Sequence, residues 1–266
     1  MKPALFAVLD GVSEQPPSAT ARQALPMTAR HDTRQSLRDG PLAALAEQIE
    51  ACRRCPRLVA WREQVAREKR AAYAGEEYWG RPLAGFGDAR ARIAILGLAP
   101  AAHGANRTGR VFTGDRSGDF LFAALWRAGL ASQPASRARD DGLALEDVWV
   151  TAAVRCAPPE NRPTPAERDR CLPYTRSELA LLPNVRVMIC LGAFAWDAAL
   201  RLQRSPPRPR PKFAHLAEHL LAGAGGERDP VLLASFHVSQ QNTFTGRLTE
   251  AMFDAVLARA LELAGG

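Results

Sequence analysis

Short apolar runs alternate with amphipathic stretches along the chain from about residue 92 onwards. The apolar runs cover 92–97, 147–154, 185–192 and 230–237, and apolar residues at helical spacing mark 117–130, 165–182, 193–203 and 247–263. Strands that are apolar on both faces and alternate with helices are typical of a parallel sheet covered by helices. The pattern therefore predicts an α/β fold.

The N-terminal part of the chain has a different pattern. Residues 1–40 mix Pro, Ser, Thr, Gln and Arg without a sustained period, which predicts an irregular extension. Apolar residues at helical spacing then predict a helix over 41–55 and another after Pro56, with the sequence CRRC at their junction. We expect one domain over 41–266, with linkers at 132–142, 204–211 and 223–229.

Composition narrows the class of protein. The 266 residues are 47% hydrophobic, enough for one full core. The 35 Lys and Arg against 28 Asp and Glu give a net charge of +7, which suits a partner rich in phosphates without requiring one. No stretch reaches the roughly 18–20 apolar residues of a membrane span, and the N-terminal run ALFAVL is shorter than the apolar core of a signal peptide, about 7–15 residues. We expect a soluble, cytoplasmic protein whose five cysteines are reduced.

The loops after three of the predicted strands carry the candidate chemistry. In an open parallel sheet, ligands bind beyond the carboxyl ends of the strands. The segments 97–115, 155–165 and 237–246 follow the first, second and fourth predicted strands. We therefore expect these three loops to meet at one site.

The loop GLAPAAHGANRTGRVFTGD at 97–115 matches neither GxxxxGK[ST] nor GxGxxG, so a nucleoside triphosphate is a poor candidate for its ligand. Its glycines, Gly97 among them, would let the backbone approach a flat ligand, and Phe112 either offers a face for a base or fills the core. Asn106 can donate and accept hydrogen bonds, or can serve only as a turn residue. Asp115 is expected to cap the helix that begins near Ser117.

His237 stands where the last apolar strand gives way to the polar loop SQQNTFTGR. A histidine there is either an edge residue with its hydrogen bonds satisfied or a catalytic donor. Three amides, Gln240, Gln241 and Asn242, suit the base edges in a nucleic-acid groove. Arg247 suits phosphate, and an ordinary polar turn is the alternative interpretation of the whole loop.

Four of the five cysteines form a candidate metal site: Cys52, Cys55, Cys156 and Cys171. The first two make a CxxC pair, whereas the other two end a predicted strand and lie in the helix that follows it. Four thiolates suit zinc or an iron–sulfur cluster, and the spacing alone leaves both open, together with free thiols. Cys190, inside VMICLG, is expected to be a core residue.

Taken together, these segments resemble the iron–sulfur family 5 of the uracil-DNA glycosylase superfamily. The resemblance is carried by CRRC, YWGRPLAGFGD, GLAPAAHGANRTGRVFTGD, AAVRCAPPENRPTPAERDRC and HVSQQNTFTGRLT, which stand in the family's order from about residue 45 onwards. It implies a three-layer α/β/α fold with a central four-stranded parallel sheet, and a 4Fe–4S cluster on the four cysteines. It also implies removal of a damaged base from DNA.

The resemblance also implies roles for the site residues. The target nucleotide would leave the helix stack, and Phe112 would stack on its base. His237, helped by main-chain N–H groups of 98–101, would donate to the base oxygen as negative charge grows there. Asn106 would hold the attacking water or steady the sugar cation. The expected base-binding residues are Gly97, Leu98, Ala99, Pro100, Ala101, Phe112 and Ala152.

Two departures from other families of the superfamily shape the expected mechanism. Leu98 and Ala99 stand where other families have a carboxylate, so no carboxylate of that motif can activate water and the reaction should be largely dissociative. Ala152 stands near the point where several relatives have an Asn that reads the pyrimidine edge. Loss of that amide should relax discrimination, so we expect release of uracil, hypoxanthine and modified uracils or cytosines.

The expected partner is DNA that contains these bases, bound by a monomer. Arg53, Arg54, Arg155 and Arg162 lie near the cysteines in sequence and are expected to meet phosphates. The main alternative is a non-catalytic DNA-binding protein whose cysteines hold zinc. A glycosylase that traps DNA covalently through His237 is disfavoured, because the chain has no evident basic insertion beside its first motif.

Overall fold

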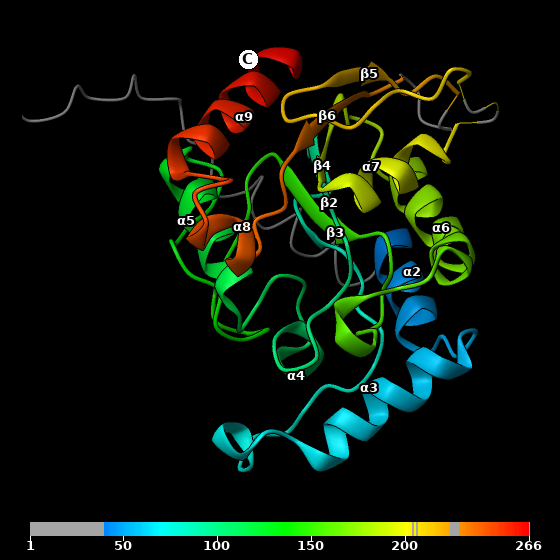
Figure 1. Cartoon of the computed structure of the whole chain (residues 1–266), viewed down its shortest axis with the longest axis vertical. Helices are drawn as coiled ribbons and strands as arrows, with labels where there is room; N and C mark the ends of the chain where they lie inside the picture. Colours follow the sequence, from blue (N-terminus) through cyan, green and yellow to red (C-terminus); the bar gives the residue numbers. More distant parts are fainter. Residues whose placement is uncertain (1–39, 204, 206, 224–228, 266) are drawn as a thin grey trace, which may run out of the picture.

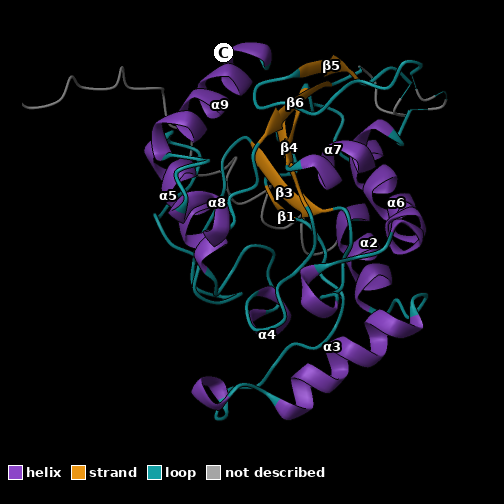
Figure 2. Ribbon diagram, in the orientation of Figure 1, coloured by secondary structure: helices purple, strands orange, loops and turns teal. Residues whose placement is uncertain are grey.

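A mixed β-sheet of six strands runs through the centre of the described part of the chain (Figures 1 and 2). The structure is a computed structural model that describes residues 40–203, 205, 207–223 and 229–265. The predicted extension over 1–40 lies outside these residues except for Gly40. Parts of the predicted linkers at 204–211 and 223–229 lie outside them as well.

The four central strands are the predicted ones, and they are parallel in the order β3-β2-β4-β6. Two short edge strands, β1 and β5, pair antiparallel with β3 and β6. The sheet is therefore mixed and has six strands among the described residues rather than the predicted four, because strands of two or three residues are too short to show a period. The strands are β1 (Phe86–Gly87), β2 (Ile93–Gly97), β3 (Val148–Ala152), β4 (Val187–Leu191), β5 (Glu218–Leu220) and β6 (Val231–Ser235).

Both faces of the sheet are buried. Successive side chains of a strand point to opposite faces, and in β2 Ile93 and Ile95 belong to one hydrophobic cluster whereas Ala94 and Leu96 belong to another. Cys190 of β4 is fully buried in the second cluster, which confirms it as a core residue. Two separate cores, one on each face, explain why the strands are apolar without alternation.

Helices cover each face of the sheet (Figure 1). α5 and α9 pack on the first face, and α6 and α7 on the second, which confirms the three-layer α/β/α arrangement. Two short helices, α4 and α8, lie within segments predicted as loops. The described helices are α2 (Pro41–Glu50), α3 (Pro56–Glu68), α4 (Ala105–Thr108), α5 (Arg116–Arg127), α6 (Pro165–Ala180), α7 (Ala193–Leu200), α8 (Gln240–Phe244) and α9 (Glu250–Leu263), with 3₁₀ turns at Ala71–Tyr73 and Pro159–Asn161.

Local sequence decides where the helices next to the sheet's carboxyl edge begin. The carboxylate of Asp115 accepts a hydrogen bond from the N–H of Gly118 at 3.1 Å and caps α5, as predicted. Thr164 and Glu167 form a capping box at the start of α6. These caps end the loops after β2 and β3 at defined positions. None of the described helices is both long and apolar enough to cross a membrane.

Candidate active site

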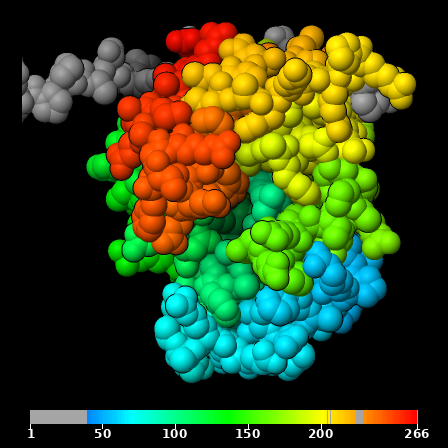
Figure 3. All heavy atoms as spheres, viewed as in Figure 1, coloured from blue at the N-terminus to red at the C-terminus, as the bar shows by residue number. Residues whose placement is uncertain are grey.

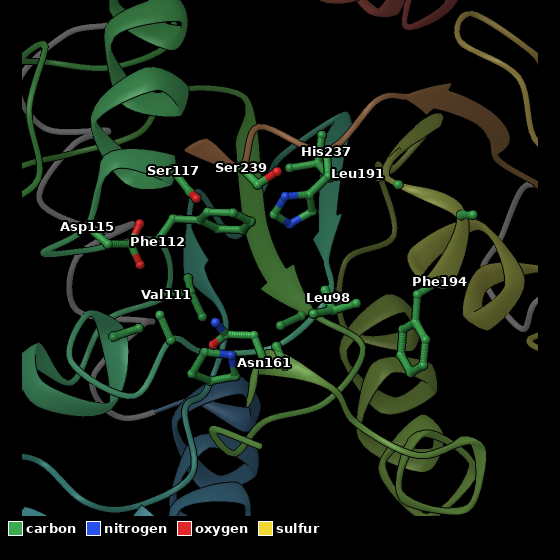
Figure 4. A pocket seen from close by; sticks show the side chains of 17 residues that line it. Leu98, Val111, Phe112, Asp115, Ser117, Asn161, Leu191, Phe194, His237 and Ser239 are labelled. Atoms are coloured by element: carbon green, nitrogen blue, oxygen red, sulfur yellow. The ribbon is translucent and has the colours of Figure 1, made fainter. Parts of the chain in front are cut away.

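A cavity of about 340 Å³ opens at the carboxyl ends of the parallel strands, where the space-filling view is hollowed between the orange segment after β6 and the green segments (Figure 3). Its walls come from the segments after β2, β3 and β6, as predicted, and also from residues 191–194 at the end of β4 and just after it. Its volume lies in the range of about 300–1,000 Å³ that small-molecule sites occupy. The polar residues of its largely apolar wall are Asp115, Ser117, Asn161, His237 and Ser239 (Figure 4). The cavity therefore suits a flat ligand with a few polar edge groups.

The segment after β2 forms one wall of the cavity. Residues 98–101 all line it, as predicted. Gly97 is not part of the wall, although it was expected to contact the ligand. It is buried at the end of β2 against the ring of Phe112, and a Cβ at position 97 would lie 2.5 Å from Cζ of that ring. Gly97 thus shapes the site by leaving room for Phe112.

Phe112 and His237 lie side by side on the cavity wall (Figure 4). Their ring centroids are 6.4 Å apart, and the ring planes are tilted by 34°. Phe112 has a φ of 52°, which is strained for a bulky side chain. Gly118 makes this conformation possible, since a Cβ there would lie 1.8 Å from the carbonyl oxygen of Phe112. The partly exposed ring offers its face to a ligand in the cavity.

His237 directly follows β6 and places its imidazole in the cavity (Figure 4). Burial lowers its pKa to about 4, so the ring is neutral at neutral pH and carries one N–H donor. Gly192, with a φ of 89°, packs closely enough that a Cβ there would lie 3.2 Å from Cβ of His237. The side-chain nitrogen of Asn242 donates to the main-chain oxygen of His237 at 2.8 Å. These contacts hold a neutral imidazole in the cavity wall.

Asp115 is the one carboxylate that the described residues place in the cavity wall. Burial is the largest influence on its carboxyl group and raises its pKa, while N–H groups of Gly118 and Ser117 act in the opposite direction. Leu98 and Ala99 leave no carboxylate at the start of the 97–115 segment, as expected, yet the fold brings one in from its end. The sequence predicts only a helix cap for Asp115, whereas the structure also places this residue in the cavity wall.

Asn106 does not reach the cavity wall. It is 1% exposed, and its amide nitrogen donates to the main-chain oxygens of Arg62, at 3.3 Å, and Ala102, at 3.4 Å. Its Oδ1 is buried without a hydrogen-bond partner among the described residues. The neighbouring Ala105 lines the cavity instead. The catalytic role of Asn106 therefore stays a prediction, whereas its observed contacts hold the turn after Pro100.

Asn161 is a site residue that the sequence analysis missed. It ends the 3₁₀ turn after β3 with a φ of 55°, and its side chain lies at the cavity wall (Figure 4). In the sequence, PPENRP has only the signal of an irregular loop. Ala152, at the end of β3, lines the cavity as predicted. The cavity wall thus has an amide side chain from the loop after β3 rather than from β3 itself.

The predicted DNA-contacting residues lie in α8 or shortly after it. Gln240, Gln241 and Arg247 are exposed, whereas Asn242 is partly buried and engaged with His237. Phe244 is the most exposed large apolar side chain in this region at 64%, and the guanidinium of Arg116 lies 5.2 Å from its ring centre. An exposed aromatic ring beside cationic and amide side chains is typical of a nucleic-acid-binding surface.

Arg155 is not a phosphate contact, and that prediction was wrong. It is 1% exposed and bonds Glu178 at 2.6 and 2.8 Å. Glu178 also accepts from the hydroxyl of Thr151 at 2.8 Å. This buried ion pair ties β3 to α6, because an arginine that follows an apolar strand into the core needs a partner. The other three, Arg53, Arg54 and Arg162, are exposed.

The four predicted metal ligands come together from three separate segments. Cys55, Cys156 and Cys171 belong to one buried cluster, and Cys52 packs beside it against Tyr174. None of these four cysteines forms a disulfide in the described part of the chain. The described residues contain no group of three or more His, Cys, Asp or Glu side chains already arranged around a metal position. The number, type and convergence of these donors nevertheless fit a group held by four thiolates.

A buried cation lies beside the thiols. Arg62 is 1% exposed, and its Nη1 donates to Sγ of Cys156 at 3.4 Å. Its Nη2 donates to the main-chain oxygen of Cys52 at 3.3 Å. A guanidinium in this position offsets the negative charge that deprotonated thiols would carry. The charge distribution is therefore consistent with thiolate ligands.

A phenyl ring, a neutral histidine and a carboxylate line a cavity at the carboxyl edge of an α/β/α sheet, an arrangement that suits an enzyme site for a flat heterocycle. The family model of the uracil DNA glycosylase superfamily matches residues 84–261 of this chain. The chain belongs to that superfamily.

Individual relatives agree with this assignment. A Type-5 uracil-DNA glycosylase from Mycobacterium bovis is 53% identical over 227 residues, which are 85% of this chain and 83% of the relative. Proteins of the same name from Thermus thermophilus, 54% identical over 84% of this chain and 98% of the relative, and from Pyrobaculum aerophilum, 45% identical over 80% and 89%, are similar as well. The predicted family and the predicted glycosylase class are confirmed, and the non-catalytic alternative is excluded.

Proposed function

We propose that the protein flips uracil out of DNA and hydrolyses its glycosidic bond, and that it acts in the same way on other deaminated bases. The observation that carries this proposal is the cavity beside Phe112 and His237. The glycosidic carbon is out of reach inside a duplex, so the nucleotide has to leave the stack. Stacking on Phe112 then offsets part of the unstacking cost.

His237 and Asp115 would divide the chemistry between the two ends of the breaking bond. As the bond from the base nitrogen to the sugar carbon breaks, its electron pair moves to the base, and the neutral imidazole donates its N–H to the base oxygen. Main-chain N–H groups of Leu98, Ala99 and Ala101, which line the cavity, would support the same charge. Asp115 stabilises the sugar cation, orients water towards the sugar carbon and accepts the proton of that water. Asp115 thus takes the role that the sequence analysis assigns to Asn106.

The shape of the wall supports a broad range of bases. Small residues form much of it: Ala99, Ala101, Ala105, Ala152, Gly192 and Ala193. Their size leaves room for a purine such as hypoxanthine or for a modified pyrimidine. Asn161, on a loop, is the amide that would meet the edge of the base. An edge contact from a loop tolerates different bases more readily than one from a strand, since loops are more mobile.

We assign Cys52, Cys55, Cys156 and Cys171 to a 4Fe–4S cluster, with zinc as the alternative that the iron content distinguishes. When bound, the cluster would supply a rigid link between the α2–α3 junction, the loop after β3 and α6. It has no part in breaking the glycosidic bond in this proposal.

Contacts to DNA would come from the region around α8. Gln240 and Gln241 suit base edges, Arg247 suits phosphate, and the exposed ring of Phe244 is placed to enter the stack where the nucleotide leaves it. Asn242 would act by holding His237. The monomeric state and the cytoplasmic location stay predictions.

A panel of duplexes with single lesions tests the proposal. The wild-type protein should release uracil, hypoxanthine and modified pyrimidines, and Asn161→Ala should change the ratios of their rates. Asn184→Ala is the matched control, because Asn184 is an exposed amide just before β4, at the opposite edge of the sheet. Release of uracil alone would contradict the broad range. Equal rate ratios in the Asn161 and Asn184 variants would contradict edge reading by Asn161.

A further inference from the structure

Phe112 is held between two residues that belong to one buried polar network. We define the Arg110 clamp as Arg110, Thr113, Ser136 and Asp141. Arg110 stands two residues before Phe112 and Thr113 directly after it, and the other two come from the segment 132–142, which the sequence pattern marks only as a linker. The clamp therefore connects a distant loop to the residue proposed to stack on the base.

The bonds of the Arg110 clamp are short and mutually satisfied. The Arg110 guanidinium donates to Oδ2 of Asp141 at 2.7 Å and to Oγ of Ser136 at 2.6 Å. Its Nε donates to the hydroxyl of Thr113 at 3.2 Å. The hydroxyls of Ser136 and Thr113 lie 2.5 Å apart. Arg110, Thr113 and Ser136 are each less than 5% exposed, so water has little access to the hydrogen bonds between them.

Asp141 is tied to its own loop at the same time. Its carboxylate accepts from the N–H groups of Arg137 at 2.6 Å and Leu143 at 3.0 Å. Burial favours the neutral acid, yet the bonds from Arg110 and from these N–H groups lower the pKa of Asp141 to about 2. The carboxylate therefore stays charged, and the loop at 137–143 is stiff where it meets Arg110.

This network sits beside the one strained bulky residue of the cavity wall. A left-handed φ at Phe112 is unfavourable for a bulky side chain and persists only where the surroundings determine it. The ring is confined by Gly97 on one side, and its carbonyl by Gly118 on another. Neither contact acts on the backbone on both sides of Phe112. The Arg110 clamp does, because it fixes residues 110 and 113.

We propose that the Arg110 clamp is a positioning device that keeps Phe112 in its strained conformation and so sets the plane on which the flipped base stacks. The inference rests on the proposed function, in which Phe112 contacts the base. Ser136 and Asp141 are positioning residues here: they touch neither the cavity nor the ligand position. The loop 132–142 thereby takes part in excision from outside the site.

Single-turnover excision measures the effect. Ser136→Ala removes one hydroxyl and no charge, and Asp141→Asn weakens the ion pair while it keeps the shape of the side chain. Both variants should lower the maximal excision rate about 10-fold to 100-fold, the range expected when a positioning group shifts by about 1 Å. Their affinity for undamaged duplex should be unchanged, because the exposed residues around α8 are untouched. Ser136→Thr, which retains the hydroxyl, should keep most of the rate.

The matched control is a similar ion pair at the other edge of the sheet. Arg92 donates to Asp147 at 2.6 and 2.9 Å, just before β2 and β3 begin. Asp147→Asn should lower the melting temperature as much as Asp141→Asn does and leave the maximal excision rate unchanged. An equal loss of rate in both variants would mean that the clamp contributes only stability, and would overturn the proposal.

A Phe112→Ala background separates this inference from the proposed function. If the clamp acts through Phe112, Ser136→Ala and Asp141→Asn should cause no further loss of rate once the ring is absent. Losses that multiply would overturn the clamp proposal and leave the stacking role intact. A Phe112→Ala protein with the wild-type rate would instead refute stacking itself. If Asp141→Asn fails to fold, the comparison of Ser136→Ala in the wild-type and Phe112→Ala backgrounds tests the clamp proposal by itself.

Discussion

Gly97→Ala is a one-carbon change that tests whether the position of the Phe112 ring controls excision. Gly97 is the last residue of β2, and its backbone is not in the left-handed region, so alanine fits its conformation. The added Cβ, however, would lie 2.5 Å from Cζ and 2.7 Å from Cε2 of Phe112. The ring is therefore the group that has to move.

The size of the movement follows from these distances. Carbon atoms in ordinary contact lie about 3.5–4.0 Å apart, so the ring would retreat by about 1 Å, into the open cavity. A displacement of about 1 Å at a reacting group costs on the order of 100-fold in rate, which is about 2.7 kcal/mol in activation free energy. Stability should change little, because the ring has room to retreat and alanine is favoured over glycine within a strand by about 0.5–1 kcal/mol.

The assay is single-turnover release of uracil from a duplex, together with thermal unfolding of the same preparations. Gly75→Ala is the matched control, since a Cβ at Gly75 would meet nothing within 4 Å and its φ is not left-handed. Gly97→Ala should be slow and stable, and Gly75→Ala should match the wild type in both. A wild-type rate for Gly97→Ala would refute the reasoning, because the base would then tolerate a displaced ring.

Four further predictions concern the chemistry and its support. His237→Ala should slow excision about 10²–10³-fold and leave the binding of undamaged duplex unchanged. Because the pKa of His237 is about 4, the wild-type rate should show no imidazole titration between about pH 5 and 8, and a change in rate near the ordinary histidine pKa would contradict a neutral donor. Asp115→Asn should keep the helix cap, and hence most of the melting temperature, while it slows excision. Since burial raises the pKa of Asp115, the wild-type excision rate should fall as the pH drops through that raised pKa. The same fall in rate at low pH in the Asp115→Asn variant would show that another group causes it. Cys171→Ser should lose bound iron and melt at a lower temperature, whereas full folding and activity without iron would contradict the assigned cluster. Arg155→Ala should destabilise the fold by about 3–5 kcal/mol in denaturant titrations, because it leaves Glu178 buried without its cation. A loss of DNA affinity without a loss of stability would instead support the original prediction that Arg155 contacts phosphate.

The core of the fold could be predicted because each of its elements has a local signal. β2, β3, β4 and β6 are continuous apolar runs, and the helices between them carry their own periodicity and caps. The edge strands β1 and β5 have two and three residues. Such strands depend on the neighbour that they pair with rather than on their own sequence, so no pattern reveals them.

The candidate site divides in a similar way. Phe112 and His237 were candidates from their positions in a glycine-rich loop and at a strand end, but each position also allowed an ordinary structural role, and the resemblance to the family favoured a place in the site. Asp115 was identified correctly as a helix cap, yet its place in the cavity depends on how the loop folds back. Arg155 was misjudged as a phosphate contact, and Asn106 lies behind the cavity wall rather than in it, for one reason: a polar residue beside a functional motif can be turned inward, and only the packing of its neighbours shows this.

By itself, the sequence determined the parallel four-stranded core, the helices on its faces and the three loops that meet at its carboxyl edge. The physical reason is that hydrophobic periodicity and helix caps are local properties that survive in any tertiary context. Only the tertiary structure decided that Asp115 and Asn161 line the cavity, that Asn106 lies behind its wall and that the loop 132–142 reaches Arg110. Those placements depend on contacts between residues far apart in the chain, and a left-handed φ at Phe112 is stable only within such contacts.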